Sequence, residues 1–149
     1  MNSIGPIERG VFAATNRQRL HHIGFVVASI SPTVERFARS VAASWDGQII
    51  HDPLQAVRVA FLRPGSSEGP LIELVEPAGP ESPVSSFVTR GGGLHHLCYE
   101  VDVLDAQLEF ARSIGGLVVR SPSPAVAFGG RRIAWIYTAQ RLLLEYLDR

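Results

Sequence analysis

The chain contains no lysine, a single cysteine and no net charge over its 149 residues. Because every basic residue is arginine, chemistry that requires a lysine Schiff base is excluded. The lone Cys98 cannot support an internal disulfide framework, which is typical of a reducing compartment. The balance of 14 basic and 14 acidic residues gives no broad positive field for nucleic acid or anionic membrane. We therefore expect a cytoplasmic protein whose partners are small molecules.

Long apolar runs are also missing. No apolar stretch reaches the roughly 18 residues of a membrane-spanning helix. The first residues include charged side chains such as Glu8 and Arg9 and have no apolar core, so they predict neither an anchor nor a secretion signal. A chain of 149 residues fits one compact domain. We predict a lead-in segment over residues 1–18 and a single domain over residues 19–149.

What the chain does contain is an internal repeat. The octapeptide LHHIGFVV at 20–27 returns as LHHLCYEV at 94–101, about 74 positions later. Three more landmarks recur in the same order at nearly the same offset, namely FARS at 37–40 and 110–113, RVAFL at 58–62 and RIAWI at 132–136, and LIEL at 71–74 and LLEY at 143–146. Two copies are too few for a solenoid. The repeat therefore predicts two equivalent modules, over residues 19–77 and 94–149.

Each module has the pattern strand, helix, strand, strand, strand. In the first we expect strands at 20–28, 47–50, 56–62 and 71–75 and a helix at 32–43 that Ser31 caps. A linker at 76–93 contains a short helical patch at 84–89. In the second module we expect strands at 94–101, 117–120, 131–137 and 142–147 and a helix at 104–114.

Neither module can bury both faces of its sheet alone. Packed together with pseudo-twofold symmetry, two βαβββ modules form a cupped eight-stranded sheet with the helices outside. The predicted fold is therefore α+β, and equivalent side chains of the two halves should face one cleft.

Four polar residues recur at matching positions in otherwise apolar strands. His22 matches His96, and Glu73 matches Glu145. Side chains alternate across a strand, so only one histidine of each His-His pair should point into the cleft. A buried carboxylate is costly unless it is paired or binds a metal. Two imidazoles and two carboxylates suit a divalent ion such as Co, Mn, Ni, Fe or Zn, and the residues do not choose among these.

Several strings in this order carry a family resemblance: LHHIGFVV, LIELVEP, ESPVSSF, GLHHLCYEVD, GGRRIAWIY and LLLEYL. Together they resemble the vicinal oxygen chelate superfamily, also called the glyoxalase/bleomycin resistance/dioxygenase superfamily, and most of all its methylmalonyl-CoA epimerase branch. The resemblance covers residues 20–147. It implies paired βαβββ modules and a metal ion held by His22, Glu73, His96 and Glu145. His21 and His95 are the alternatives at the histidine positions, or they support the site or face outwards.

The resemblance also implies a reaction. Such a metal stabilises an enolate, so that the proton next to the carbonyl of a small acyl thioester, for example an acyl-CoA, becomes removable. We expect the carboxylates Glu145 and Glu73 to carry this proton. The resemblance therefore implies a metal-dependent isomerase of the epimerase type. A homodimer is a plausible assembly, since residues 1–18 and the apolar helix faces could pack on a second copy.

Two departures from the epimerase branch leave the reaction open. Epimerases of this type can carry an acid/base glutamate on the third strand of the first module, but residues 56–62 offer only Arg58. The loop before the last strand is shortened to residues 138–141. An extradiol-type dioxygenase, a glyoxalase-like lyase and a non-enzymatic binding or resistance protein of the same fold are the alternatives. Glu73 disfavours the dioxygenase, because a fourth protein ligand would occupy the position of dioxygen or catechol.

Other residues have two interpretations each. Arg131 and Arg132 could bind a phosphate or carboxylate of a ligand, or could be an exposed pair at the start of a strand. Arg58 could likewise bind such a group, or could point to solvent from its strand. Phe61 and Trp135 occupy symmetric positions and are predicted to be core residues, with stacking on a ligand as the alternative. Cys98 has no activating neighbour in the sequence and is predicted to be a small buried residue.

Overall fold

The computed structural model describes residues 16–65 and 68–149. The first module and the linker contain β1 (Gln18–Val26), α1 (Val34–Ser40), β2 (Ala43–Trp45), β3 (Ile50–Asp52), β4 (Val57–Pro64), β5 (Leu71–Pro77) and α2 (Ser85–Thr89). The second module contains β6 (Gly93–Val101), α3 (Leu104–Ser113), β7 (Leu117–Pro124), the 3-10 turn η1 (Val126–Phe128), β8 (Arg132–Tyr137) and β9 (Leu143–Asp148).

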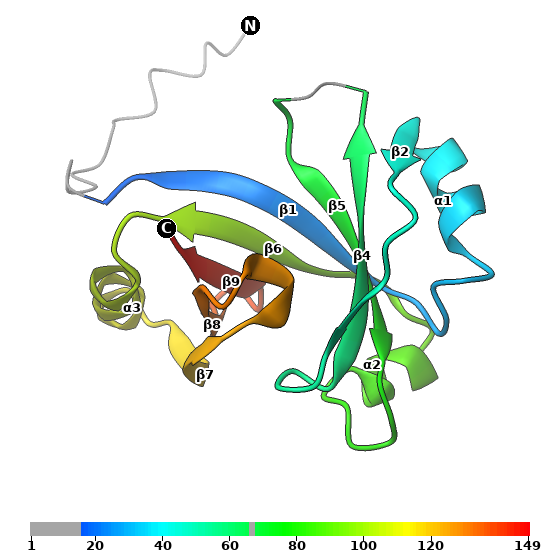
Figure 1. Cartoon of the computed structure of the whole chain (residues 1–149). Helices are drawn as coiled ribbons and strands as arrows, with labels where there is room; N and C mark the ends of the chain where they lie inside the picture. The colour runs from blue at the N-terminus through cyan, green and yellow to red at the C-terminus, as the bar shows by residue number, and fades with distance from the viewer. Residues whose placement is uncertain (1–15, 66–67) are drawn as a thin grey trace, which may run out of the picture.

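The strands form one curved sheet with the order β2-β4-β5-β1-β6-β9-β8-β7, and β3 pairs with β4 beside this path. The order is symmetric about the antiparallel β1–β6 pair, because β5, β4 and β2 on one side correspond to β9, β8 and β7 on the other. Figure 1 shows α1 and α3 at opposite ends of the sheet. The predicted α+β fold of two βαβββ modules is confirmed, but the predicted number of eight strands is wrong, since the described residues form a sheet of nine strands.

The ninth strand arises from a break in the first module. The counterpart of the continuous β7 is divided into β2 and β3. Between them, the Asp46 carboxylate accepts a hydrogen bond from the Gln48 amide at 2.9 Å, and Gly47 has a φ of 82°. A short Asp side chain followed by a left-handed Gly is typical of a turn. The strand predicted at 47–50 is therefore wrong over most of its length.

The helix predicted at 32–43 is also too long at both ends. Residues 31–33 form a turn, and α1 begins at Val34 without a side-chain cap, so the predicted capping by Ser31 is wrong. Ala42 has a φ of 50°, outside the helical region, and this turns the chain into β2. The linker helix α2, the helix α3 of the second module and the strands β8 and β9 lie within one or two residues of their predicted bounds. Strand β7 extends beyond the predicted 117–120.

Alternation along the strands divides each module into a helix-facing side and a cleft-facing side. Ile72 and Leu74 of β5 pack in the core under α1, and the equivalent Leu144 and Tyr146 of β9 pack under α3. The intervening residues of these strands face the other side of the sheet. Glu73 and Glu145 are thereby directed towards the concave face, where they line a cavity.

Of the predicted lead-in segment at 1–18, residues 1–15 lie outside the described residues. Asn16 already contacts the second module, since its amide donates to the Val103 carbonyl and to the Gln107 side chain, both at 3.1 Å. β1 follows from Gln18. None of the helices in the described ranges is long and apolar enough to cross a membrane.

Candidate metal centre

The four symmetric polar residues meet at the centre of the sheet. His22 lies on β1, Glu73 on β5, His96 on β6 and Glu145 on β9, which are four adjacent strands. The Nε2 atoms of His22 and His96 lie 3.1 Å apart, and Glu73 Oε2 lies 3.2 Å from each of them. Glu145 Oε1 lies 3.6 Å from His22 Nε2. All four side chains are buried.

These separations match a shared ion. Two donors that are each about 2.1 Å from one metal lie about 3.0 to 3.4 Å apart in octahedral or tetrahedral geometry, close to the separations observed. Within the described part of the chain, Glu145 Oε1 is buried and receives no hydrogen bond. A buried carboxylate oxygen without a donor is costly. Neutral imidazole nitrogens and carboxylate oxygens therefore provide a donor set that fits a divalent ion.

The two carboxylates of the centre differ in acidity. Burial raises the pKa of Glu73, but the facing His22 and His96 imidazoles outweigh it, and the net pKa is well below the ordinary value. Burial also raises the pKa of Glu145, and here the attraction of the imidazoles does not offset it, so the net pKa is raised. Burial lowers the pKa of His22, yet Glu73 and Glu145 raise it above its usual value. Glu73 is thus the permanently ionised member, and Glu145 holds a proton more readily.

The preceding histidines also contact the centre. His21 Nδ1 lies 2.8 Å from His22 Nδ1, and His95 Nδ1 lies 2.9 Å from His96 Nδ1. His95 lines the same cavity as His96, so the prediction that only one histidine of that pair faces the cleft is wrong. Burial lowers the pKa of both His21 and His95 to about 4, which keeps their rings neutral near pH 7.

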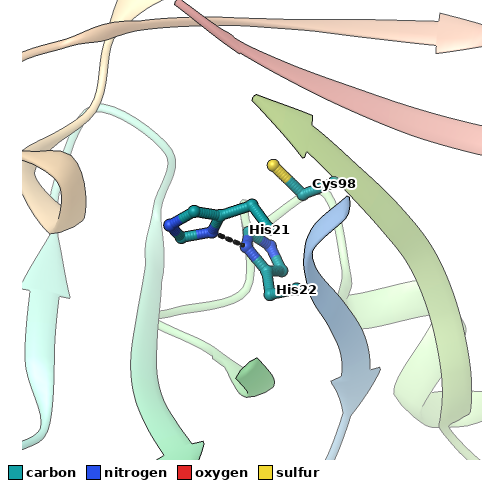
Figure 2. Close-up of side chains that lie close together, drawn as sticks. All are labelled: His21, His22 and Cys98. Carbon is teal, nitrogen blue, oxygen red and sulfur yellow. Dashed lines mark hydrogen bonds between the residues drawn. The ribbon is translucent and has the colours of Figure 1, made fainter. Parts of the chain in front are cut away.

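A second group of potential ligands lies beside the first. His21, His22 and Cys98 have ligand atoms within 4.8 Å of one another, and Figure 2 shows the two rings joined at their nitrogens with the thiol nearby. Burial raises the pKa of the Cys98 thiol well above its usual value, and the Glu145 carboxylate adds to the shift. The thiolate that a metal requires is therefore disfavoured, and the group with Glu73 and His96 is the stronger candidate.

Small residues make room for the two central rings. Gly24 pairs with His96 across β1 and β6, and Cys98 pairs with His22. A Cβ atom on Gly24 would overlap the imidazole ring of His96. Gly24 and Cys98 occupy matching positions in the two modules. The glycine in HHIGF was therefore a signal for the site that the sequence interpretation did not use.

A cavity of about 330 Å³ opens onto Glu73, His96 and Glu145. Its walls are mostly apolar. The lining includes Val57, Val59, Val75, Val84, Ala125, Phe128, Ile133, Trp135 and Leu143. Trp135 packs against the core cluster around Ile133, as predicted. It also lines this cavity and packs edge-on against His96, with ring centroids 4.7 Å apart. Phe61 packs edge-on against His22 at 5.8 Å.

Three further polar residues line the cavity. Asp52, Gln55 and Arg120 line it. Asp52 accepts hydrogen bonds from the Leu54, Gln55 and Val126 amides at 3.0 to 3.1 Å, so its carboxylate holds the loops of the two modules together. Arg120 donates to the Leu54 carbonyl at 2.7 Å. Among the described residues that line this cavity, it is the only arginine.

The remaining arginine candidates lie elsewhere. Arg131 pairs with Glu100 at 2.9 Å, and Arg132 pairs with Asp148 at 2.7 Å. Arg58 forms an ion pair with Glu76 at 3.1 Å. None of these three arginines lines the cavity, and each forms its ion pair with a residue outside the cavity lining.

The chain is similar in sequence and in fold to several known proteins. Residues 21–135 match the family described as Glyoxalase/Bleomycin resistance/Dioxygenase superfamily. The ethylmalonyl-CoA/methylmalonyl-CoA epimerase of Cereibacter sphaeroides is 26% identical over 80% of this chain and 87% of its own length. The human mitochondrial methylmalonyl-CoA epimerase is 27% identical over 68% of this chain, which spans only 56% of the human protein.

A solved structure has the same architecture. A variant of Streptomyces coelicolor methylmalonyl-CoA epimerase in complex with 2-nitronate-propionyl-CoA superimposes with a TM-score of 0.73 at 25% sequence identity. The match covers 87% of this chain and 96% of that one.

Proposed function

The chain belongs to the glyoxalase/bleomycin resistance/dioxygenase superfamily, and we propose that it is a metal-dependent isomerase of the methylmalonyl-CoA epimerase type. Its reaction is the removal and return of the proton next to the carbonyl of a small acyl thioester. The observation that carries the proposal is the convergence of His22, Glu73 and His96, whose ligand atoms lie 3.1 to 3.2 Å apart. Glu145 Oε1 lies 3.6 Å from His22 Nε2 and has no hydrogen-bond donor among the described residues.

The ligands of the metal are His22, Glu73, His96 and Glu145. A bound Co, Mn, Ni, Fe or Zn ion would supply a Lewis acid that stabilises negative charge developing on the substrate oxygen. The protein side chains have separate tasks. Burial of all four keeps water from the polar atoms, and the paired strands hold the donors in place before substrate arrives.

Glu145 is the proton carrier. Its carboxylate borders the cavity, and in the metal-free protein burial raises its pKa, so that it accepts a proton more readily than Glu73 does. Glu73 also borders the cavity, but its lowered pKa favours a permanently charged ligand. Glu73 is therefore the second catalytic candidate, and the difference in acidity supports the division of tasks.

The cavity supports an acyl thioester as substrate. A volume of about 330 Å³ with apolar walls suits a small acyl group. Arg120 lies at the same cavity and offers a guanidinium to a carboxylate of the substrate. The Streptomyces coelicolor structure contains 2-nitronate-propionyl-CoA, which favours an acyl-CoA among the possible thioesters.

Hydrogen exchange tests the proposal directly. Metal-loaded protein is incubated in heavy water with methylmalonyl-CoA or ethylmalonyl-CoA, and deuterium at the carbon next to the thioester is measured by mass spectrometry. The proposal predicts incorporation that depends on the metal and is lost in Glu145→Gln. Absence of exchange with stoichiometric metal bound would contradict the epimerase-type reaction.

A glyoxalase-like lyase is the second candidate. The cavity-facing positions of β4 are Val57 and Val59, so this strand provides no acid/base carboxylate. A reaction in which only the carboxylates of the metal centre transfer the proton would need no such carboxylate on β4. An absorbance assay for thioester formation from a 2-oxoaldehyde and a thiol distinguishes the two enzymes, because only the lyase would form this product. A non-enzymatic binding protein would be indicated by purification without stoichiometric metal.

The setting of the reaction is part of the proposal. A cytoplasmic location is supported by the single, buried Cys98.

We also propose a homodimer, which sedimentation at several protein concentrations would detect. The balanced charge supports neither nucleic acid nor membrane as a partner.

A further inference from the structure

His21 and His95 share an unusual position in the backbone. Along the β1–β6 pair, Leu20 faces Tyr99 and His22 faces Cys98, so His21 has no partner across the pair. Gly24 faces His96 and Phe25 faces Leu94, so His95 has none on its side. Each residue is the extra residue of a β-bulge. Bulges occur beside functional sites, where they redirect a side chain that strand alternation would send to the other face.

Both bulges produce the same contact. The ring of each bulge histidine turns back so that its Nδ1 meets the Nδ1 of the next residue, at 2.8 Å for His21–His22 and 2.9 Å for His95–His96. The Nε2 atoms of His22 and His96 remain directed at Glu73 and at each other. The repeated geometry in two modules indicates a function common to both.

The chemistry of imidazole gives the direction of these hydrogen bonds. A neutral imidazole that offers its Nε2 lone pair to a metal carries its proton on Nδ1 and must donate there. The Nδ1 atoms of His21 and His95 are then the acceptors. A hydrogen bond to the second nitrogen orients a metal-binding histidine and selects its tautomer.

We propose that His21 and His95 are positioning residues, which accept a hydrogen bond from Nδ1 of His22 and His96 and thereby hold each Nε2 ready for the metal. The inference rests on the proposed metal centre and adds two residues to it. His21 and His95 accept these hydrogen bonds through neutral imidazole rings. They therefore orient His22 and His96 without adding a third negative charge beside Glu73 and Glu145.

Neighbouring aromatic rings hold the two histidines in place. His21 packs edge-on against Phe128, with centroids 5.5 Å apart. His95 packs edge-on against Phe87 at 4.9 Å and against Trp135 at 6.1 Å. These contacts fix the ring planes through side-chain packing, so the acceptors are oriented by the fold itself.

A metal site made of His21, His22 and Cys98 is the competing explanation for the first contact (Figure 2). The second module argues against it. The position equivalent to Cys98 is Gly24, yet the His95–His96 contact has the same length to within 0.1 Å. A thiol is therefore not needed for the contact, and positioning explains both copies.

Zinc affinity tests the proposal through matched variants. The oxygen of asparagine occupies nearly the position of histidine Nδ1, while phenylalanine keeps a ring without an acceptor. Competition with a chelator should show about 10- to 100-fold weaker zinc binding for His21→Phe and for His95→Phe, and near wild-type binding for His21→Asn and His95→Asn. His51→Phe, at an exposed position of β3, is the control. Near-ultraviolet circular dichroism of each variant verifies folding.

Nitrogen-15 spectra of the zinc-loaded protein give a second readout. His22 and His96 should carry the proton on Nδ1, and His21 and His95 should have an unprotonated Nδ1. Equal zinc affinity in the phenylalanine variants, or a proton on Nδ1 of His21 or His95, would overturn the positioning role while leaving the metal centre intact. A wild-type protein that binds no zinc and no other divalent ion would overturn the metal centre as well.

Discussion

At the scale of single residues, the two carboxylates of the centre are close together in space and different in environment. Glu73 lies 3.2 Å from the Nε2 atoms of both histidines, whereas Glu145 Oε1 lies 3.6 Å from one of them and has no hydrogen-bond donor in the described chain. The pKa of Glu73 is lowered and that of Glu145 is raised. Similar residues can therefore serve as fixed ligand and as proton carrier.

Replacement of each carboxylate by an amide separates the two roles. Glu145→Gln keeps an oxygen for the metal but removes the base, and we expect kcat to fall about 100- to 10,000-fold. Glu73→Gln keeps the oxygen as well and should cost less than about tenfold in kcat, because Glu73 is not the principal proton carrier. Steady-state kinetics with metal content measured in parallel would check this. Equal losses in the two variants would contradict the assignment.

The metal-free protein should show a particular dependence of stability on pH. Burial raises the pKa of Glu145, and Glu73 and Glu145 raise that of His22 against the effect of burial. Both groups bind protons more tightly in the folded state, so their contribution is full below the unfolded-state pKa and is lost as pH rises through the folded one. Glu73 acts in the opposite direction and its contribution is lost in acid, below its unfolded value of about 4.5.

We therefore expect the free energy of unfolding of metal-free protein to decrease as pH rises above the unfolded-state pKa values of about 4.5 for Glu145 and 6.5 for His22, as measured by urea unfolding in the presence of a chelator. In Glu145→Gln the decrease should be smaller, because one of the two groups is gone. An unchanged slope in the variant would show that Glu145 does not titrate in this range.

At the scale of elements, the β1–β6 pair provides most of the geometry of the centre. It carries His22 and His96, both bulges, and the small residues Gly24 and Cys98 that face the rings. Gly24 also pairs with Glu73 on β5, and Cys98 pairs with Glu145 on β9. Each of the four candidate ligands thus pairs with Gly24 or Cys98 on one of its two neighbouring strands.

Gly24→Ala tests the importance of this space. A methyl group at position 24 would overlap the His96 ring, so the ring must move away from Glu73. We expect zinc affinity to fall by more than about tenfold, measured by chelator competition. The matched control is Gly65→Ala, since a Cβ there meets no atom within 4 Å. Wild-type affinity in Gly24→Ala would show that the ring position is not critical.

At the scale of the whole molecule, the proposed metal connects the two modules. His22 and Glu73 belong to the first module, and His96 and Glu145 belong to the second. Asp52 makes a second connection, because it accepts a hydrogen bond from the Val126 amide of the second module at 3.0 Å. A ligand that binds only the folded state stabilises it through mass action, so the metal should strengthen the fold as a unit.

Thermal unfolding should show this coupling. At free zinc about 100-fold above its Kd, the folded state gains about 2.7 kcal/mol, which corresponds to a rise in Tm of about 5 to 10 °C. Scanning calorimetry with zinc or with chelator measures the shift, and both modules should unfold in one transition. His96→Ala, which lacks a ligand, should show little shift. A full shift in that variant would place the metal elsewhere.

Much of the architecture was predictable because it depends on local patterns. Alternation along β5 and β9 and the apolar spacing of α3 are visible over a few residues, and the repeat supplied the symmetry of the sheet. The errors occurred where one turn decides the path, as at Asp46 and Gly47 between β2 and β3. There the Asp46-Gly47 pair forms a turn, although the residues around it have the pattern of a strand.

By itself, the sequence determined the two-module fold and selected His22, Glu73, His96 and Glu145, because a repeated polar residue in an apolar strand is informative wherever the strand lies. In the structure, ligand atoms of His22, Glu73 and His96 lie 3.1 to 3.2 Å apart, and Glu145 Oε1 lies 3.6 Å from His22 Nε2. Only the tertiary structure decided that His21 and His95 turn towards them. A bulge is a property of two paired strands, and β1 and β6 are far apart in the chain, so neither strand alone shows which residue lacks a partner.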